Sequence, residues 1–216
     1  MSTVSNDQSI TFIPFHQGFD IIEKLNPAIH STLLDISNRY DGLCELICNR
    51  ILIDNDLGRG NHENYLKNRI TIESLNQEMI TSSHLLNVFS IFHKAIAYLF
   101  RIFPDNIFSF WDQWRLVDWT YSVNPQIFKK GLRNIENGEV LKLGVFHQGW
   151  FNLEGHSLLI KKIDNDQYVF FDPNHGEYRG LSTSSLRSKI NAVIKEHEAT
   201  NIFITRGTDY LKRLEG

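Results

Sequence analysis

The sequence is poor in cysteine, which limits how the chain can be stabilised. Only two of its 216 residues are cysteines, Cys44 and Cys48, and they lie four positions apart in a segment with helical periodicity. One possible pair over so short a loop is no basis for a disulfide framework. We therefore predict two free thiols and a reducing compartment at the place of action.

Long apolar runs and a large excess of charge of one sign are also missing. The longest apolar candidate, Leu85–Phe103, is interrupted by polar and charged residues, so no stretch reaches the roughly 18 residues of a membrane-spanning helix. The formal net charge of −3 gives no reason to expect nucleic acid or an anionic membrane as a partner. The composition, with 42% hydrophobic and 22% charged residues, is that of an ordinary soluble globular protein.

The N-terminus lacks a basic segment followed by an apolar one, the pattern of a conventional secretory signal peptide. Residues 1–9 are mostly polar instead. We expect residues 1–15 to form a disordered leader and residues 16–216 to form a single domain. The leader is either an ordinary ragged terminus or a signal read by a dedicated export machine.

The rest of the chain divides into a helical part and a later strand-rich part. Apolar residues recur at a helical period in the first part, whereas β-branched and aromatic runs between turn residues predict strands from Glu139 onward. Helices followed by an antiparallel sheet with one late helix are typical of the α+β class. The predicted helices cover Phe19–Ile36, Cys44–Leu57, His62–Thr81, Ser83–Phe103 and Ser182–Ala199, and the predicted strands cover Val140–Phe146, Gly155–Ile163, Gln167–Asp172, Glu177–Leu181 and Asn201–Thr205.

The strand-rich part contains a predicted hairpin with a histidine and a carboxylate at one end. Two apolar runs flank Asp164-Asn165-Asp166, a composition typical of a hairpin turn. His156 opens the first strand and Asp172 closes the second, so antiparallel pairing brings them to the same end of the sheet. An imidazole beside a carboxylate is an oriented base.

A nucleophile for this base is available at Cys44, which follows Gly42 and opens a helical run. The helix dipole and the free backbone N–H groups at such a position favour a thiolate. The residues therefore indicate a Cys44/His156/Asp172 site for thiol acyl transfer. Asn38, six residues before Cys44, is a candidate donor to the oxyanion.

Two other assignments are weaker. Cys48 lies one turn inside the helix, away from the field of its N-terminus, and is expected to be a buried structural thiol. Asp172 and His175 have a spacing that a metal site can use, but no third ligand lies close to them in sequence. We predict no metal and no cofactor.

These residues resemble the YopT/AvrPphB family of papain-like cysteine peptidases, which are effector proteins injected by bacterial pathogens and symbionts. The similar pieces are Gly42-x-Cys44, Gly155-His156-Ser157 and the block Phe170–Glu177, which reads Phe-Phe-Asp-Pro-Asn-His-Gly-Glu. The separations between them are similar as well, and the resemblance covers roughly Asn38 to Phe203. One departure is Glu45, because the family often has a small residue after its cysteine.

The resemblance implies a papain-like catalytic domain, with a helical half that carries Cys44, a sheet half that carries His156 and Asp172, and substrate in the cleft between them. It also implies proteolysis without a cofactor by a virulence effector of type III secretion, exported without a conventional signal peptide and active in the host-cell cytoplasm. Family substrates include prenylated Rho-type small GTPases and plant protein kinases, some members process their own N-terminus, and a secretion chaperone is an expected partner.

Two alternatives to a peptidase remain open. A glutamine deamidase or transglutaminase on the same scaffold uses the same thioester chemistry and differs in what the cleft admits. A non-catalytic effector would bind a host protein and carry a vestigial site. The sequence names neither the substrate nor the host.

Overall fold

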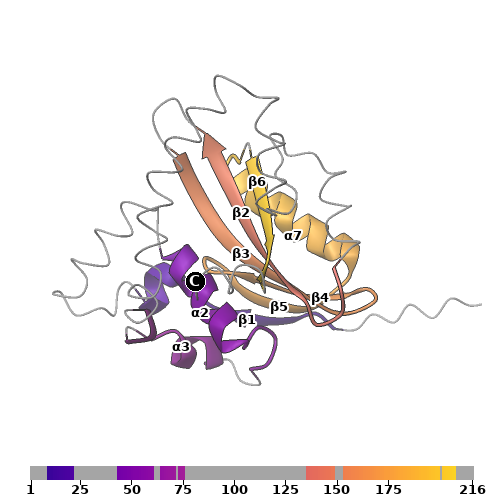
Figure 1. Cartoon of the computed structure of the whole chain (residues 1–216), viewed down its shortest axis with the longest axis horizontal. Helices are drawn as coiled ribbons and strands as arrows, with labels where there is room; N and C mark the ends of the chain where they lie inside the picture. The colour runs from indigo at the N-terminus through magenta and orange to yellow at the C-terminus, as the bar shows by residue number, and fades with distance from the viewer. Residues whose placement is uncertain are drawn as a thin grey trace, which may run out of the picture.

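The computed structural model describes residues 9–21, 43–60, 64–71, 73–75, 135–148, 153–199 and 201–207. These residues form a six-stranded sheet and helices that pack on both of its faces (Figure 1). The α+β class predicted from the sequence is confirmed. The elements in chain order are β1 (Thr11–Pro14), the π-helical turn η1 (Gln17–Ile21), α2 (Cys44–Asp54), α3 (Tyr65–Arg69), β2 (Val140–Gln148), β3 (Leu153–Asp164), β4 (Gln167–Asp172), β5 (Gly176–Leu181), α7 (Thr183–Glu196) and β6 (Asn201–Arg206).

The sheet has the strand order β1-β5-β4-β3-β2-β6, and every neighbouring pair is antiparallel. The predicted hairpin is confirmed as β3 and β4, with Leu159 opposite Phe171 and a turn at Asn165 and Asp166. The chain then turns back through β5, so the end of β4 lies in the middle of the sheet. Asp172 therefore ends a buried central strand.

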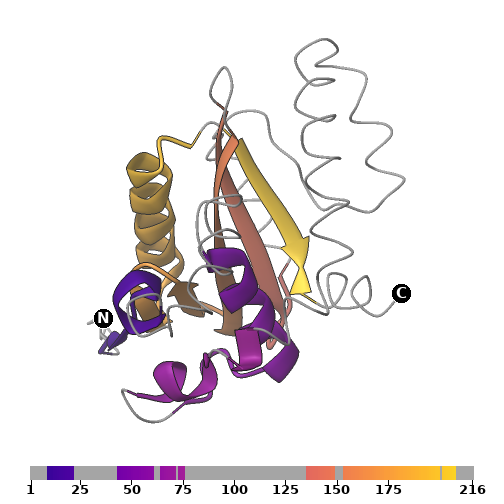
Figure 2. The ribbon, with the colours of Figure 1, turned by 90° about the vertical axis from the view of Figure 1, so that its left-hand side faces the viewer.

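Side chains that alternate along the strands build one core on each face of the sheet. Leu158 and Ile160 face α7, whereas Leu159 between them faces α2. Figure 2 shows α7 along one side of the sheet. The α2 face buries Ile13, Phe15, Leu46, Ile47, Ile51, Leu66, Leu159, Val169 and Phe171, and the α7 face buries Leu141, Leu143, Val145, Leu158, Ile160, Phe170, Leu186, Ile190 and Val193.

The two long helices begin in different ways. Ser182 caps α7, because its side chain accepts a hydrogen bond from the Ser185 backbone N–H, as expected for serine at this position. Helix α2 begins at Cys44 with no side-chain cap at Leu43. The first backbone N–H groups of α2 therefore have no acceptor within the helix.

The N-terminal segment enters the sheet earlier than the sequence indicated. Thr11–Pro14 form the edge strand β1, although residues 1–15 were expected to be a disordered leader; residues 1–8 lie outside the described part. Gly176 permits this pairing, because its φ is 121° and a Cβ there would lie 2.2 Å from the Ile13 carbonyl oxygen. A four-residue strand is too short for its alternation to stand out in the sequence.

A buried carboxylate holds the segment after α2 against the sheet. Glu177 is 0% exposed and accepts hydrogen bonds from the Tyr65 hydroxyl, the Gly58 backbone N–H and Arg179 Nε. A buried charge needs such partners to offset its lost hydration. Glu177 thus joins α3 and the loop after α2 to β5.

Several predicted features fall outside the described residues. These are most of Phe19–Ile36, all of Ser83–Phe103, much of His62–Thr81, and Asn38. Among the helices that are described, none is long and apolar enough to span a membrane.

Candidate active site

His156 and Asp172 meet at the end of the β3–β4 hairpin. Nε2 of His156 is 2.8 Å from Oδ1 of Asp172, and both side chains are buried. If the register of the hairpin is continued by one residue, Asp172 on β4 lies opposite Leu158 on β3. His156 is two residues before Leu158 on the same strand, so its side chain is on the same face of the sheet as that of Asp172. Antiparallel pairing thus produces the contact that the sequence predicted.

Cys44 joins this pair from the first position of α2. Its side chain interacts with His156, and this interaction is among those that raise the pKa of His156. Because Asp172 occupies Nε2, Nδ1 is the ring nitrogen left for the thiol. Cys44 thus interacts with the His156–Asp172 pair, although more than a hundred positions separate it from His156 in the chain.

The electrostatics of the site favour charged side chains at His156 and Asp172. Burial lowers the pKa of His156, but hydrogen bonds to Asp172 and Cys44 outweigh burial and raise the pKa from 6.5 to about 10. Burial raises the pKa of Asp172, but donors from His156, Asn174 and His175 outweigh burial and lower that pKa below 3.8. At neutral pH the pair is an imidazolium beside a carboxylate.

Cys48 has surroundings of a different kind. Its thiol donates to the backbone carbonyl of Ser157 at 3.3 Å, and burial raises its pKa well above 9.0. The prediction that this thiol is buried is confirmed, with 0% of the residue exposed. Cys44 is only 2% exposed, so the contact partner, rather than exposure, distinguishes the two thiols.

The residue after Cys44 and the residue after His156 are joined directly. Ser157 Oγ donates to Glu45 Oε2 at 2.5 Å, and Lys142 on β2 forms an ion pair with the same carboxylate. Lys142 also donates to Asn49 at 2.5 Å. The negative charge of Glu45, the departure from the family pattern, is therefore balanced by a buried lysine, and the contacts tie α2 to β2 and β3.

Asp172 has two partners besides His156. Its Oδ1 accepts from the Asn174 backbone N–H at 2.8 Å, and its Oδ2 lies 3.0 Å from Nδ1 of His175. The spacing of Asp172 and His175, weighed above as a metal motif, thus produces a direct contact between the two side chains. Among the described residues, no group of three or more His, Cys, Asp or Glu side chains is placed to hold a metal ion.

Gln17 connects the two ends of the site, and nothing in the sequence pattern pointed to it. Its Oε1 accepts from the Leu43 backbone N–H at 2.9 Å, and its Nε2 donates to Asn174 Oδ1 at 2.5 Å. Its own backbone N–H donates to the Pro173 carbonyl at 2.8 Å. One buried side chain thereby links the residue before Cys44 to the turn after Asp172.

His197 is a second residue that sequence reasoning did not select. Its ring stacks on that of His156, with centroids 4.4 Å apart and planes 14° from parallel. Nearby along the chain, Glu196 Oε2 lies 3.6 Å from His175 Nε2. The only signal in the sequence was the position of His197 at the end of a predicted helix, which does not say which strand the helix end meets.

Comparison with known proteins adds a distant likeness. No family model and no curated protein matches the chain. The crystal structure of the Pseudomonas avirulence protein AvrPphB is similar over 77% of this chain and 91% of that chain, at 15% sequence identity and a TM-score of 0.48. At that level the likeness carries no assignment of activity, and any such assignment depends on the contacts described above.

Proposed function

We propose that this chain is a cysteine peptidase in which Cys44 attacks the substrate carbonyl, His156 transfers protons and Asp172 orients His156. The observation that supports this most is the buried hydrogen bond between His156 and Asp172, together with the interaction of Cys44 with the same imidazole. A nucleophile, a base and a group that orients the base are the parts required for thiol acyl transfer.

The proposed reaction proceeds in two halves. With its proton already on His156, Cys44 attacks the scissile carbonyl as a thiolate; the imidazolium then protonates the leaving amine as the thioester forms. In the second half, His156 takes a proton from water, the hydroxide attacks the thioester, and Cys44 is released. Backbone N–H groups in the first turn of α2 are candidate donors to the oxyanion, and Asn38 stays a predicted donor outside the described residues.

We further propose a host protein as substrate, cleaved in the host cytoplasm by a secreted bacterial effector. This step depends on the sequence resemblance of the Phe170–Glu177 block and its separation from Cys44. A small GTPase or a protein kinase is the expected kind of substrate. The proposed papain-like arrangement places that substrate between the Cys44 helix and the sheet.

The test is a comparison of new protein termini in host lysate treated with wild type, Cys44→Ala or Cys48→Ala. New termini are expected with wild type and with Cys48→Ala, and not with Cys44→Ala. Cys48→Ala should cost about 1 kcal/mol or more of stability, because it removes a buried sulfur. A mass change on an uncleaved target would indicate the deamidase or transglutaminase instead, and activity lost only with Cys48 would reverse the assignment.

A further inference from the structure

The ring of His156 has a contact on its face as well as at Nε2. Asp172 lies at Nε2, Cys44 interacts with the imidazole, and the nearly parallel ring of His197 covers one face. Rotation of an imidazole about its Cβ–Cγ bond has no sharp staggered minima. The orientation of this ring therefore depends on what touches it, and a flat neighbour 4.4 Å away restricts tilting.

The backbone holds His197 in place for this contact. His197 follows the last residue of α7, and its backbone N–H donates to the Val193 carbonyl at 2.9 Å. Its side-chain Nε2 is buried and has no hydrogen-bond partner among the described residues. Within the described part of the chain, no polar contact at Nε2 holds the ring, so stacking on His156 is the contact that we take to place it.

We propose that His197 is a positioning residue for His156: its neutral ring keeps the imidazole of His156 between Asp172 and Cys44, and its protonation at acid pH disrupts that arrangement. This inference rests on the proposed function only insofar as His156 serves Cys44. It assigns His197 no contact with substrate.

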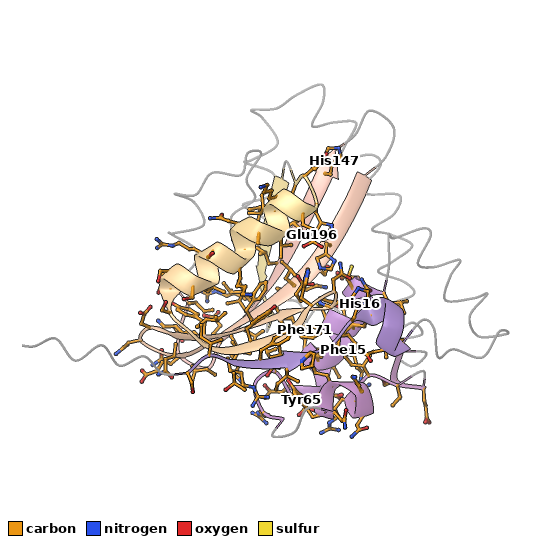
Figure 3. The ribbon with its side chains drawn as sticks, turned by 180° about the vertical axis from the view of Figure 1, so that it is seen from behind. Phe15, His16, Tyr65, His147, Phe171 and Glu196 are labelled. Carbon is orange, nitrogen blue, oxygen red and sulfur yellow. The ribbon has the colours of Figure 1, made fainter. Side chains whose placement is uncertain are left out.

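The charges around His197 explain why its ionisation state matters. His156 on β3, Asp172 on β4, His175 in the β4–β5 turn and Glu196 on α7 all interact with it electrostatically. Figure 3 shows Glu196 near the end of α7, the residue before His197. Two stacked imidazolium rings would repel each other, and neither carboxylate separates them.

The pKa of His197 supports the same reading. Burial lowers it below 6.5, and the positive charge of His156 lowers it further, although Glu196 and Asp172 act in the opposite direction. Near neutral pH, His197 is therefore the neutral member of the stack and His156 the charged one. As pH falls and His197 takes up a proton, the repulsion acts on His156.

The test measures the rate at which iodoacetamide alkylates Cys44, from acid to neutral pH, with the modified cysteine located by peptide fragmentation. The variants are His197→Ala, which removes the ring, and His197→Phe, which keeps a flat ring that cannot titrate. His147→Phe is the matched control, because the His147 ring contacts the Glu198 carbonyl oxygen instead. The same series is assayed for kcat and KM on a cleaved substrate.

At neutral pH, His197→Ala should slow alkylation of Cys44 and lower kcat by about 10- to 100-fold, as expected when a catalytic group is misplaced. His197→Phe should stay within about threefold of wild type, because an aromatic face also stabilises a cation. In His197→Phe, the fall of the alkylation rate at acid pH should move to lower pH by about one unit, because no second positive charge forms beside His156. His147→Phe should match wild type throughout.

The proposal would be overturned if Cys44 in His197→Ala were alkylated at the wild-type rate. It would also be overturned if the alkylation rate of His197→Phe fell at the same acid pH as that of wild type. His197→Phe keeps the test valid if His197→Ala does not fold, which circular dichroism would reveal. Alkylation requires no peptidase activity. Rapid alkylation of Cys44 that depends on His197, without cleavage of any substrate, would therefore uphold this inference and sink the proposed function.

Discussion

Two thiols one helical turn apart have different surroundings. The Cys44 thiol interacts with His156, whereas the Cys48 thiol donates to the Ser157 carbonyl. An imidazole can exchange a proton with a thiol, but a backbone carbonyl can only accept a hydrogen bond. The proposed difference between a nucleophile and a structural thiol thus arises within one turn of α2.

Asp172→Asn tests the role of the carboxylate at the residue scale. Loss of the carboxylate removes the charge that favours the imidazolium and allows the wrong tautomer of His156, which costs about 10⁴-fold in the serine triad. A thiolate–imidazolium pair depends less on proton transfer during attack. We therefore expect a loss of roughly 10- to 10³-fold in kcat, or about 1.4–4 kcal/mol of barrier, with KM little changed.

Asp166→Asn is the matched control for this change. Asp166 lies in the β3–β4 turn, and its carboxylate accepts hydrogen bonds from Thr183. It should leave kcat unchanged. Equal activity of wild type and Asp172→Asn, at matched folding, would exclude Asp172 from the site and leave the hairpin as scaffold only.

At the scale of elements, the site depends on how α2 is held against the sheet. Glu45 and Ser157 join the residues next to Cys44 and His156, and η1 joins the start of α2 to the turn after β4 through Gln17. Phe15, just before η1, packs on Phe171 of β4, with ring centroids 5.9 Å apart (Figure 3). The N-terminal segment is therefore part of the support of the site.

Gln17→Ala should weaken both stability and turnover. It leaves the Leu43 N–H and the Asn174 amide without this partner, which costs about 1–3 kcal/mol for each buried group left unsatisfied. We expect a lower free energy of unfolding in denaturant titrations and a lower kcat at matched folding. The kcat effect follows because the Cys44 helix is no longer tied to the Asp172 turn.

Gln17→Glu is a milder change that tests the same prediction. Its carboxylate still accepts from Leu43, and Asn174 can turn its amide to donate, so the loss should be smaller than with Gln17→Ala. If Gln17→Ala kept wild-type stability and turnover, the contacts of η1 would have no part in supporting the site.

For the whole molecule, ionisation of the site links stability to pH. His156 has a folded pKa of about 10, above its ordinary 6.5, so its contribution is complete below 6.5 and is lost as pH rises toward 10. His197 and Asp172 have lowered pKa values, so their contributions are lost as pH falls below 6.5 and 3.8 respectively. The free energy of unfolding should therefore be highest near pH 6.5.

Denaturant titrations of wild type and His156→Gln from pH 4 to 10 check this dependence of stability on pH. The range runs from near the ordinary pKa of Asp172 to the raised pKa of His156. The decline of stability between pH 6.5 and 10 should be much shallower in His156→Gln. Cys48→Ala controls for ionisation of the buried thiol, which adds to the decline above about 9.0. Parallel curves for wild type and His156→Gln would show that His156 titrates normally.

The sequence by itself determined the local elements and the side chains proposed to carry the chemistry. Strands β3 and β4, the turn at Asn165 and helix α7 follow from hydrophobic period and turn chemistry, which act between neighbouring residues. The hairpin register then placed His156 beside Asp172. The position of the turn defines which residues of the two strands lie opposite each other, and the alternation of side chains defines which of them share a face of the sheet. A cysteine at the start of a helix completed the predicted set.

Only the tertiary structure decided what surrounds that set. Gln17 and Asn174 are 157 positions apart, and Glu45 and Ser157 are 112 apart; no local pattern encodes such contacts. The same holds for β1, whose four residues form a strand because β5 offers an edge, and for His197, which meets His156 because α7 packs across the sheet. Periodicity records which face of an element is buried, but the partner across that face is chosen by packing of the whole chain.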